Sequence, residues 1–258
     1  MDYKQTEIEL AYRMLADYHT HTLHSTTGPV KHATGSVMEI VKTAHEKGLK
    51  EVAITDHGPG HFIYGVGKKF VPILRREIAE AQEKYPDVKV FLGVEANFKD
   101  TPNGLDVPPE DFALYDFVNA GYHYGVTKSR MISNFLAHKG LIRGAALERL
   151  REFNTELVLR ALKNNKIKVL THPCDKGPFD LDAICRACEE TGTLLEINAK
   201  HKHLTVDEIR RAGEYAVSFI VGSDAHKAKN VGTYVPTVLR AIEAGLNLER
   251  IVNVVPVE

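Results

Sequence analysis

Short apolar runs alternate with longer amphipathic segments along most of the chain. The longer segments, which repeat apolar residues at helical spacing, lie near 36–48, 71–84, 145–164, 180–191, 205–214 and 234–244. Ser36 with Glu39, and Thr205 with Glu208, have the spacing of capping boxes at the starts of two of these segments. The apolar runs cover 14–19, 50–56, 88–96, 115–122, 167–172, 193–198 and 218–224. The pattern predicts seven strands that alternate with helices.

Strands that alternate with helices predict parallel pairing through right-handed crossovers. The runs are almost continuously apolar, as expected when helices or strands cover both faces of a sheet. Seven units favour a closed or nearly closed barrel over an open sheet. We therefore expect an α/β fold, a distorted (β/α)7 barrel formed as a single domain by residues 1–258, with its site at the carboxyl ends of the strands.

Composition narrows the function classes only slightly. Hydrophobic residues make up 43% of the 258 residues, and 33 basic side chains nearly balance 34 acidic ones. This balance gives no indication of a nucleic-acid or membrane partner, and no apolar run approaches the length of a membrane span. The N-terminus lacks a signal-peptide core, and the three cysteines are few, so we expect a cytoplasmic protein. Cys185 and Cys188 lie one helical turn apart, which favours packing over metal or redox roles.

Potential metal ligands stand at the end of every predicted strand. In chain order they are His19 and His21, Asp56 and His57, Glu95, His123, His172, Glu196, and Asp224 with His226. In a parallel barrel these ends meet at one rim, and so many buried ionisable groups would be costly without cations. Imidazole and carboxylate ligands suit zinc, iron or manganese. The number of ligands predicts two or three divalent ions, with zinc preferred.

Five motifs give the chain a resemblance to a known family. DYHTHT at 17–22, ITDHG at 54–58, GVEAN at 93–97, THP at 171–173 and GSDAH at 222–226 occur in the order typical of the PHP (polymerase and histidinol phosphatase) superfamily. Within it, the chain resembles the stand-alone phosphoesterases that carry three metal ions. The resemblance implies a distorted barrel of seven strands and helices, in agreement with the seven apolar runs.

The resemblance also implies a role for each ligand. His19 and His21 would hold one ion together with Glu95 and Asp224. Glu95 would bridge to a second ion, whose other ligands would be His123 and His172.

A third ion would be held by His57 and His226. The family usually supplies one more ligand from the loop after HxHT, but Thr27 stands at that position and is a poor ligand. His32 is our preferred replacement and His24 the second choice.

The function implied is hydrolysis of small phosphate monoesters, as in histidinol phosphatases, by a metal-activated hydroxide. Glu95 and Asp224 are the expected catalytic carboxylates. For the phosphate itself we expect contacts from Arg143, whose guanidinium can bind bidentately, and from Lys128. His61, in a glycine-rich loop that could act as a lid, is a further candidate for substrate contact.

Three alternatives remain at this stage. An exonuclease or deoxyribonuclease would use the same metals on nucleic-acid ends, and the balanced charge argues mildly against it. An amidohydrolase also opens with HxH, but that class commonly uses a lysine where this chain has Glu95. A metal-binding module without activity is disfavoured because nearly every expected ligand is present.

Overall fold

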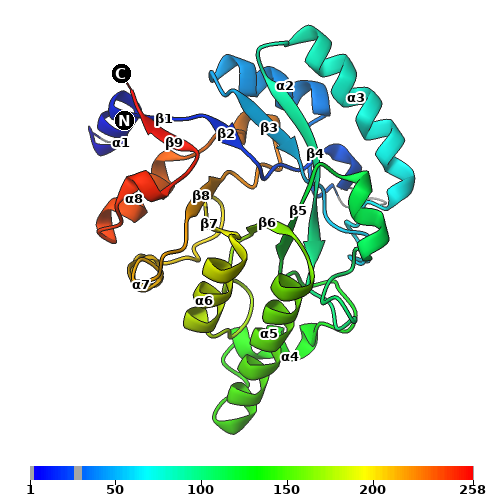
Figure 1. Cartoon of the computed structure of the whole chain (residues 1–258), viewed down its shortest axis with the longest axis vertical. Coiled ribbons are helices and arrows are strands. Elements are labelled where there is room, and N and C mark those ends of the chain that lie inside the picture. The colour runs from blue at the N-terminus through cyan, green and yellow to red at the C-terminus, as the bar shows by residue number, and fades with distance from the viewer. Residues whose placement is uncertain (1–2, 26–30, 258) are drawn as a thin grey trace.

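The computed structural model describes residues 3–25 and 31–257, so Thr27 lies outside the described residues. Seven parallel strands form one sheet in which each strand pairs with the next in the chain (Figure 1). They are β2 (Ala16–Asp17), β3 (Glu51–Ile54), β4 (Lys89–Asn97), β5 (Phe117–Gly121), β6 (Ile167–Leu170), β7 (Leu194–Asn198) and β8 (Phe219–Gly222). The predicted seven-stranded barrel is confirmed.

Helices surround the sheet and connect its strands (Figure 1). They are α2 (Val37–Glu46), α3 (Val71–Lys84), α4 (Met131–His138), α5 (Ala145–Asn164), α6 (Leu181–Thr191), α7 (Val206–Ala212) and α8 (Val235–Glu243). Both predicted capping boxes are present, at Ser36 with Glu39 and at Thr205 with Glu208. Among the described residues, no helix is long and apolar enough to cross a membrane.

A side chain closes the barrel where its first and last strands meet. In the described structure β2 and β8 form no continuous ladder, and only Thr20 and Ala225 beyond their ends make a parallel bridge. Asn253 fills the gap: its Nδ2 donates to the carbonyls of Ala16 and Val221, both at 2.7 Å, and its Oδ1 accepts from the Val221 amide at 2.9 Å. We call this junction the seam.

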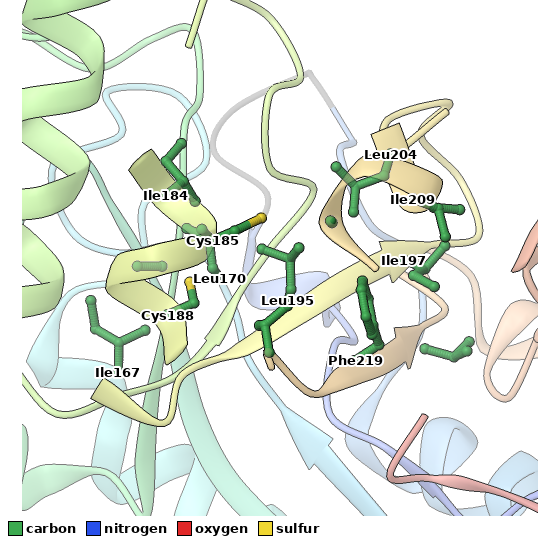
Figure 2. Close-up of a cluster of buried hydrophobic side chains, with 14 of the residues drawn as sticks. Ile167, Leu170, Ile184, Cys185, Cys188, Leu195, Ile197, Leu204, Ile209 and Phe219 are labelled. Atoms are coloured by element: carbon green, nitrogen blue, oxygen red, sulfur yellow. The ribbon is translucent and has the colours of Figure 1, made fainter. Parts of the chain in front are cut away.

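Apolar side chains fill the space between sheet and helices. On α6, Ile184, Cys185 and Cys188 face inward and pack among side chains of the neighbouring strands, such as Leu170 and Leu195 (Figure 2). Both cysteines are buried and unpaired, and burial raises the pKa of Cys185 to about 12. The packing role predicted for this pair is confirmed by its position.

The predicted first strand, 14–19, is divided in the structure. β1 (Tyr12–Met14) leaves the barrel and pairs with β9 (Val254–Pro256) in a separate two-stranded sheet, beside α1 (Tyr3–Ala11). Only β2 continues into the barrel. His19 and His21 therefore follow the strand rather than lie within it, but Thr20 between them is bridged to Ala225, which keeps the segment extended.

Candidate metal centre

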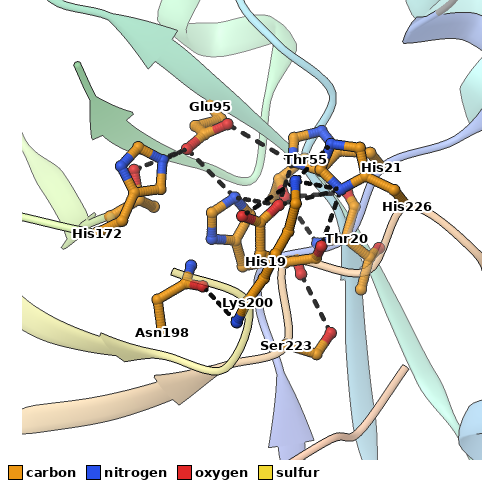
Figure 3. Close-up of polar contacts among 12 residues, drawn as sticks. His19, Thr20, His21, Thr55, Glu95, His172, Asn198, Lys200, Ser223 and His226 are labelled. Carbon is orange, nitrogen blue, oxygen red and sulfur yellow. Dashed lines mark hydrogen bonds and ion pairs between the residues drawn. The ribbon is translucent and has the colours of Figure 1, made fainter. Parts of the chain in front are cut away.

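Figure 3 shows five of the predicted ligands at the carboxyl ends of the strands, namely His19, His21, Glu95, His172 and His226. Asp56 is turned elsewhere and accepts hydrogen bonds from the hydroxyls of Thr22 and Ser25. His19, His21 and Glu95 are 1% exposed or less, and Asp224 is 3% exposed. His19 Nε2 lies 3.2 Å from Glu95 Oε1, and His21 Nε2 lies 3.3 Å from Asp224 Oδ1. These four side chains, from three separate segments of the chain, thus face a common point.

Glu95 also faces a second group of histidines. Its Oε1 lies 3.0 Å from His172 Nε2 and 3.4 Å from His123 Nε2, and the two imidazole nitrogens are 3.1 Å apart. Its Oε2 lies 3.0 Å from His57 Nδ1. The carboxylate therefore stands between two sets of nitrogen ligands, as the bridging role requires.

A third group forms where the loop that contains His32 returns to the rim. His32 Nε2 lies 2.9 Å from His57 Nε2 and 2.8 Å from His226 Nε2. His24 points elsewhere, with its Nε2 3.0 Å from Glu77 Oε2. The geometry therefore favours His32 over His24 as the third ligand of this group.

Other buried residues hold these ligands in place. Glu196 accepts from the His172 amide at 2.6 Å, and its other oxygen lies 2.7 Å from His19 Nδ1. Asn97 Oδ1 lies 2.8 Å from His123 Nδ1. Glu196, a candidate ligand by its strand-end position, thus contacts two ligands as a positioning residue. Its space depends on Gly222, where a Cβ would lie 1.8 Å from Glu196 Oε1.

Asn97 is a functional residue that the strand-end pattern did not single out. Two features could have identified it: it closes the GVEAN motif, and it lies two residues beyond Glu95 on the same strand. A histidine that ligates a metal through one ring nitrogen commonly makes a hydrogen bond with the other, which is the contact that Asn97 makes.

The charge states of Glu95 and His21 suit metal ions, whereas His19 would have to lose a proton on binding one. Burial would lower the pKa of His19, but Glu196, Glu95 and Asp224 outweigh it and raise that pKa well above its usual range. Burial alone would raise the pKa of Glu95, but His123 and His19 outweigh it and hold that pKa well below its usual range. Burial, together with His57 and His226, lowers the pKa of His21. Anionic carboxylates and neutral imidazoles are the forms that ligate metals.

Several buried atoms in the cluster make no hydrogen bond within the described part of the chain. They are His19 Nε2, His21 Nδ1 and Nε2, His57 Nδ1, His172 Nδ1 and Glu95 Oε2. Unpaired buried polar atoms are costly. Apart from His21 Nδ1 and His172 Nδ1, these atoms face one another across the cluster. Nitrogen and oxygen atoms in this arrangement fit divalent ions such as zinc.

The cluster opens into a cavity of about 240 Å³. Lys176, Lys200 and His201 line it together with several of the candidate ligands. Lys200 Nζ lies 3.2 Å from His226 Nε2 and 3.6 Å from Asp224 Oδ2. The cavity therefore presents cations beside the candidate ligands, as a phosphate group would require.

The substrate contacts expected from the sequence divide into two groups. His61 is buried and lines the cavity. Arg143 and Lys128 are both exposed and lie outside its lining, and the Arg143 Nε donates to the Gly140 carbonyl. The reason is local, because α4 forms within the long loop and carries Arg143 beyond it. Lys176 and Lys200 are instead the lysines that line the cavity.

Comparisons with known proteins agree with this geometry. The PHP domain family model matches residues 17–200. A "Probable phosphatase" of Acetivibrio thermocellus is 29% identical over 236 residues, which cover 86% of this chain and 83% of that protein. A "Probable phosphatase" of Thermoanaerobacter sp. is 27% identical over 255 residues, which cover 93% and 91%.

A solved structure shares the fold. Histidinol phosphate phosphatase from Lactococcus lactis, solved with zinc, L-histidinol and phosphate, aligns with a TM-score of 0.61 at 17% identity, covering 91% of this chain and 95% of that one. The family model covers well over half of the chain. The chain therefore belongs to the PHP family and, like the relatives it matches, is a phosphatase.

Proposed function

We propose that this PHP-family phosphatase hydrolyses small phosphate monoesters with two to three divalent ions, zinc being preferred. The observation that carries the proposal is the buried cluster of nitrogen and oxygen atoms, several of them without hydrogen bonds, that opens into a cavity lined by lysines. The zinc in the Lactococcus lactis enzyme supports the choice of ion.

Bound divalent ions supply a water of lowered pKa and neutralise phosphate charge. Glu95 and Asp224 contribute the anionic ligand atoms, and Glu196 and Asn97 fix the rings of His19 and His123. Lys200 and Lys176 hold the phosphate by its outer oxygens. Each of these groups is in place before substrate arrives, which is the condition for electrostatic preorganisation.

Proton delivery to the leaving oxygen is assigned to His201. Its Nδ1 lies 3.0 Å from Asp175 Oδ2 and its Nε2 lies 3.1 Å from Asp224 Oδ2. Burial would lower the pKa of His201, but these two carboxylates outweigh it and raise that pKa. Asp175 and Asp224 therefore favour the protonated form of His201 at the cavity wall.

A phosphodiester substrate is the second candidate, and a cationic groove favours it. Lys200, Lys227 and Lys229 line a groove of about 560 Å³ that also contacts Asp224 and His226. A groove of this kind could bind a second phosphate of a nucleic-acid end. Rates of hydrolysis of single-stranded DNA and of p-nitrophenyl phosphate decide between the diester and the monoester as substrate. If the diester is the substrate, the Lys227→Met/Lys229→Met variant should lose activity on DNA and keep its activity on p-nitrophenyl phosphate.

The decisive experiment combines elemental analysis with activity. Wild-type protein should bind two to three equivalents of metal and hydrolyse p-nitrophenyl phosphate, whereas Glu95→Ala should lose at least one equivalent and the activity. His45→Ala, which alters an exposed histidine that contacts Asp87, is the matched control and should behave as wild type. Full metal content in Glu95→Ala would contradict the bridging role, and absence of ester hydrolysis at every metal loading would contradict the phosphatase mechanism.

A further inference from the structure

A carboxylate outside the metal centre lies between β4 and the loop after β3. It belongs to Asp106, in the segment that follows β4. Phe98 and Leu105 form an antiparallel bridge, and the Asp106 amide donates to the Asn97 carbonyl at 3.0 Å. The chain therefore turns back after β4 and places Asp106 beside Asn97, the residue that contacts the candidate ligand His123.

Three N–H donors face the Asp106 carboxylate. Its Oδ1 accepts from the Asn97 amide at 2.7 Å, and its Oδ2 accepts from the Gly60 amide at 2.7 Å and from Asn97 Nδ2 at 2.5 Å. Both oxygens of a carboxylate accept, whereas an asparagine at this position would direct its own N–H₂ group at one of these donors. The surroundings therefore select an aspartate.

The glycines of the loop after β3 make room for this carboxylate. A Cβ on Gly58 would lie 2.5 Å from Asp106 Oδ1, and a Cβ on Gly60 would lie 2.6 Å from the Asp106 Cβ. The Gly58 carbonyl also accepts from Asn97 Nδ2 at 3.2 Å. The loop that brings His61 to the cavity is thus packed directly against Asp106 and Asn97.

These contacts determine which way the Asn97 amide points. Its Nδ2 donates to Asp106 and to the Gly58 carbonyl, so its Oδ1 is left to face His123 Nδ1 at 2.8 Å. Because an amide oxygen can only accept, His123 Nδ1 carries the proton. In the neutral ring, the form that ligates metals, Nε2 then keeps the free electron pair. That atom lies 3.4 Å from Glu95 Oε1, inside the cluster of candidate ligands.

From this series of contacts, we infer that Asp106 is a positioning residue for the metal centre: through Asn97 it maintains the Nδ1–H form of His123 and leaves Nε2 free for an ion. The role of the ion rests on the proposed function, whereas the position of the proton is a property of the metal-free protein. Partners that orient a metal ligand typically change metal affinity by about 10- to 100-fold when they are replaced.

Nitrogen-15 NMR of chelator-treated protein tests the proton position, because the two ring nitrogens of a neutral histidine differ in chemical shift. The ring signals of His123, assigned by their absence in His123→Gln, should show the Nδ1–H form in wild type. Asp106→Asn keeps the size of the side chain but places an N–H₂ group opposite the Asn97 donors. Asn97 should then turn its amide, and the ring of His123 should shift towards the Nε2–H form.

Zinc affinity shows whether this contact matters to the proposed centre. Competition with a chromophoric chelator should give Asp106→Asn a Kd about tenfold or more above that of wild type for one equivalent of zinc. Asn97→Ala should raise this Kd similarly. Asp106→Asn should have little further effect in the Asn97→Ala background, since Asp106 acts through Asn97.

Asp116→Asn is the matched control. The Asp116 Oδ2 also accepts from an amide of β4, that of Leu92 at 2.8 Å, but its side-chain donor is Arg75 at 2.9 Å. This variant should keep the Nδ1–H form of His123 and the wild-type Kd for zinc.

The outcomes separate the positioning role from the proposed function. An Nε2–H ring in wild type would overturn the inference without any variant, and so would an Nδ1–H ring that persists in Asp106→Asn. A rise in Kd that is equally large with and without Asn97 would also overturn it, because Asp106 would then act by another route. Wild-type protein that binds no zinc at any concentration would overturn the proposed function, and the role of Asp106 at the metal centre with it.

Discussion

At the scale of single residues, the motifs predicted which candidate ligands meet, whereas two of the three expected substrate contacts, Arg143 and Lys128, lie outside the lining of the cavity. Each candidate ligand has a short side chain and lies at or just after the end of a strand, which determines its position at the rim. His19, Glu95 and Asp224 could therefore be predicted to meet. Arg143 had no such constraint, because its loop forms α4, and a long flexible side chain after a helix can point anywhere. Lys200 follows β7 directly but looked like an ordinary solvated lysine in the sequence.

His32 and His24 provide a test of the third group of ligands. His32→Ala should reduce bound metal by about one equivalent, because its Nε2 faces both His57 and His226. His24→Ala should keep the full metal content, since His24 pairs with Glu77. Mass spectrometry of dialysed protein measures both, and the reverse result would transfer the role to His24.

Lys200 and Arg143 test which cation contacts phosphate. Lys200→Met should raise KM for p-nitrophenyl phosphate about tenfold, the effect of losing a charged hydrogen bond of about 1.4 kcal/mol. Arg143→Met should leave KM unchanged because Arg143 donates to the Gly140 carbonyl outside the cavity. Steady-state kinetics at fixed metal concentration decide, and equal effects of the two variants would show that the cavity lining does not identify the contact.

At the scale of elements, local patterns predicted helices well where capping and periodicity agree. α3 and α5 have the predicted bounds, and α2 begins after the predicted cap at Ser36. The elements that were missed depend on distant partners. β1 forms because β9, more than 200 residues later, pairs with it, and nothing in the run 14–19 marks the break at Leu15.

The cap of α2 can be measured directly. Ser36→Ala should lower the free energy of unfolding by about 1 kcal/mol, because it removes the hydroxyl that accepts from the Glu39 amide and donates to the Glu39 carboxylate. Thr43→Ala, at a half-buried position of the same helix, removes one hydrogen bond to the Glu39 carbonyl but introduces a better helix former. It should therefore change stability by less than about 0.5 kcal/mol. Urea titrations followed by circular dichroism provide the comparison, and equal losses would show that the box adds nothing to the helix.

At the scale of the whole molecule, the barrel was predictable as a class and its closure was not. Seven apolar runs gave the count of strands. The joining of β2 to β8 by Asn253 depends on one amide that resembles any loop asparagine in the sequence. The Asn253 side chain stabilises the barrel because it donates to the buried carbonyls of Ala16 and Val221, which come together only in the folded protein.

Asn253→Ala should therefore destabilise the protein by about 2–4 kcal/mol, since three buried hydrogen bonds are lost and their partners stay buried. Asn164→Ala, which removes one exposed bond to the Pro102 carbonyl, is the control and should cost little. Chemical denaturation measures both. A loss below about 1 kcal/mol in Asn253→Ala would mean that the other contacts across the seam suffice, namely the Thr20–Ala225 bridge and the hydrogen bond from the Ser223 amide to Asp17.

Acid should destabilise the metal-free protein. Burial lowers the pKa of His61 to about 4 and that of His32 to about 2, against an ordinary value of 6.5. As the pH falls, these histidines take up protons in the unfolded chain before they do so in the folded protein. The stability that their neutral forms give the folded protein is therefore present above pH 6.5 and is lost as the pH falls below it. The raised pKa values of His19, His201 and His203 act in the opposite sense. They are outnumbered, because the pKa values of His21, His123 and His172 are lowered like those of His61 and His32. The urea midpoint of chelator-treated protein should be lower at pH 5 than at pH 7.5, and an unchanged midpoint would contradict these directions.

The seam has a further consequence, because the candidate ligands lie on both of its sides. His19 and His21 follow β2, whereas Asp224 follows β8. An ion held by these three side chains would therefore join one edge of the sheet to the other. Binding of the ion only to the closed seam would raise the free energy of local opening by about 2.7 kcal/mol at a free ion concentration one hundred times Kd. The amides of His21 and Ala225 make hydrogen bonds across the seam, and their hydrogen exchange would slow on metal addition. The proposed cofactor would then also stabilise the closure of the barrel.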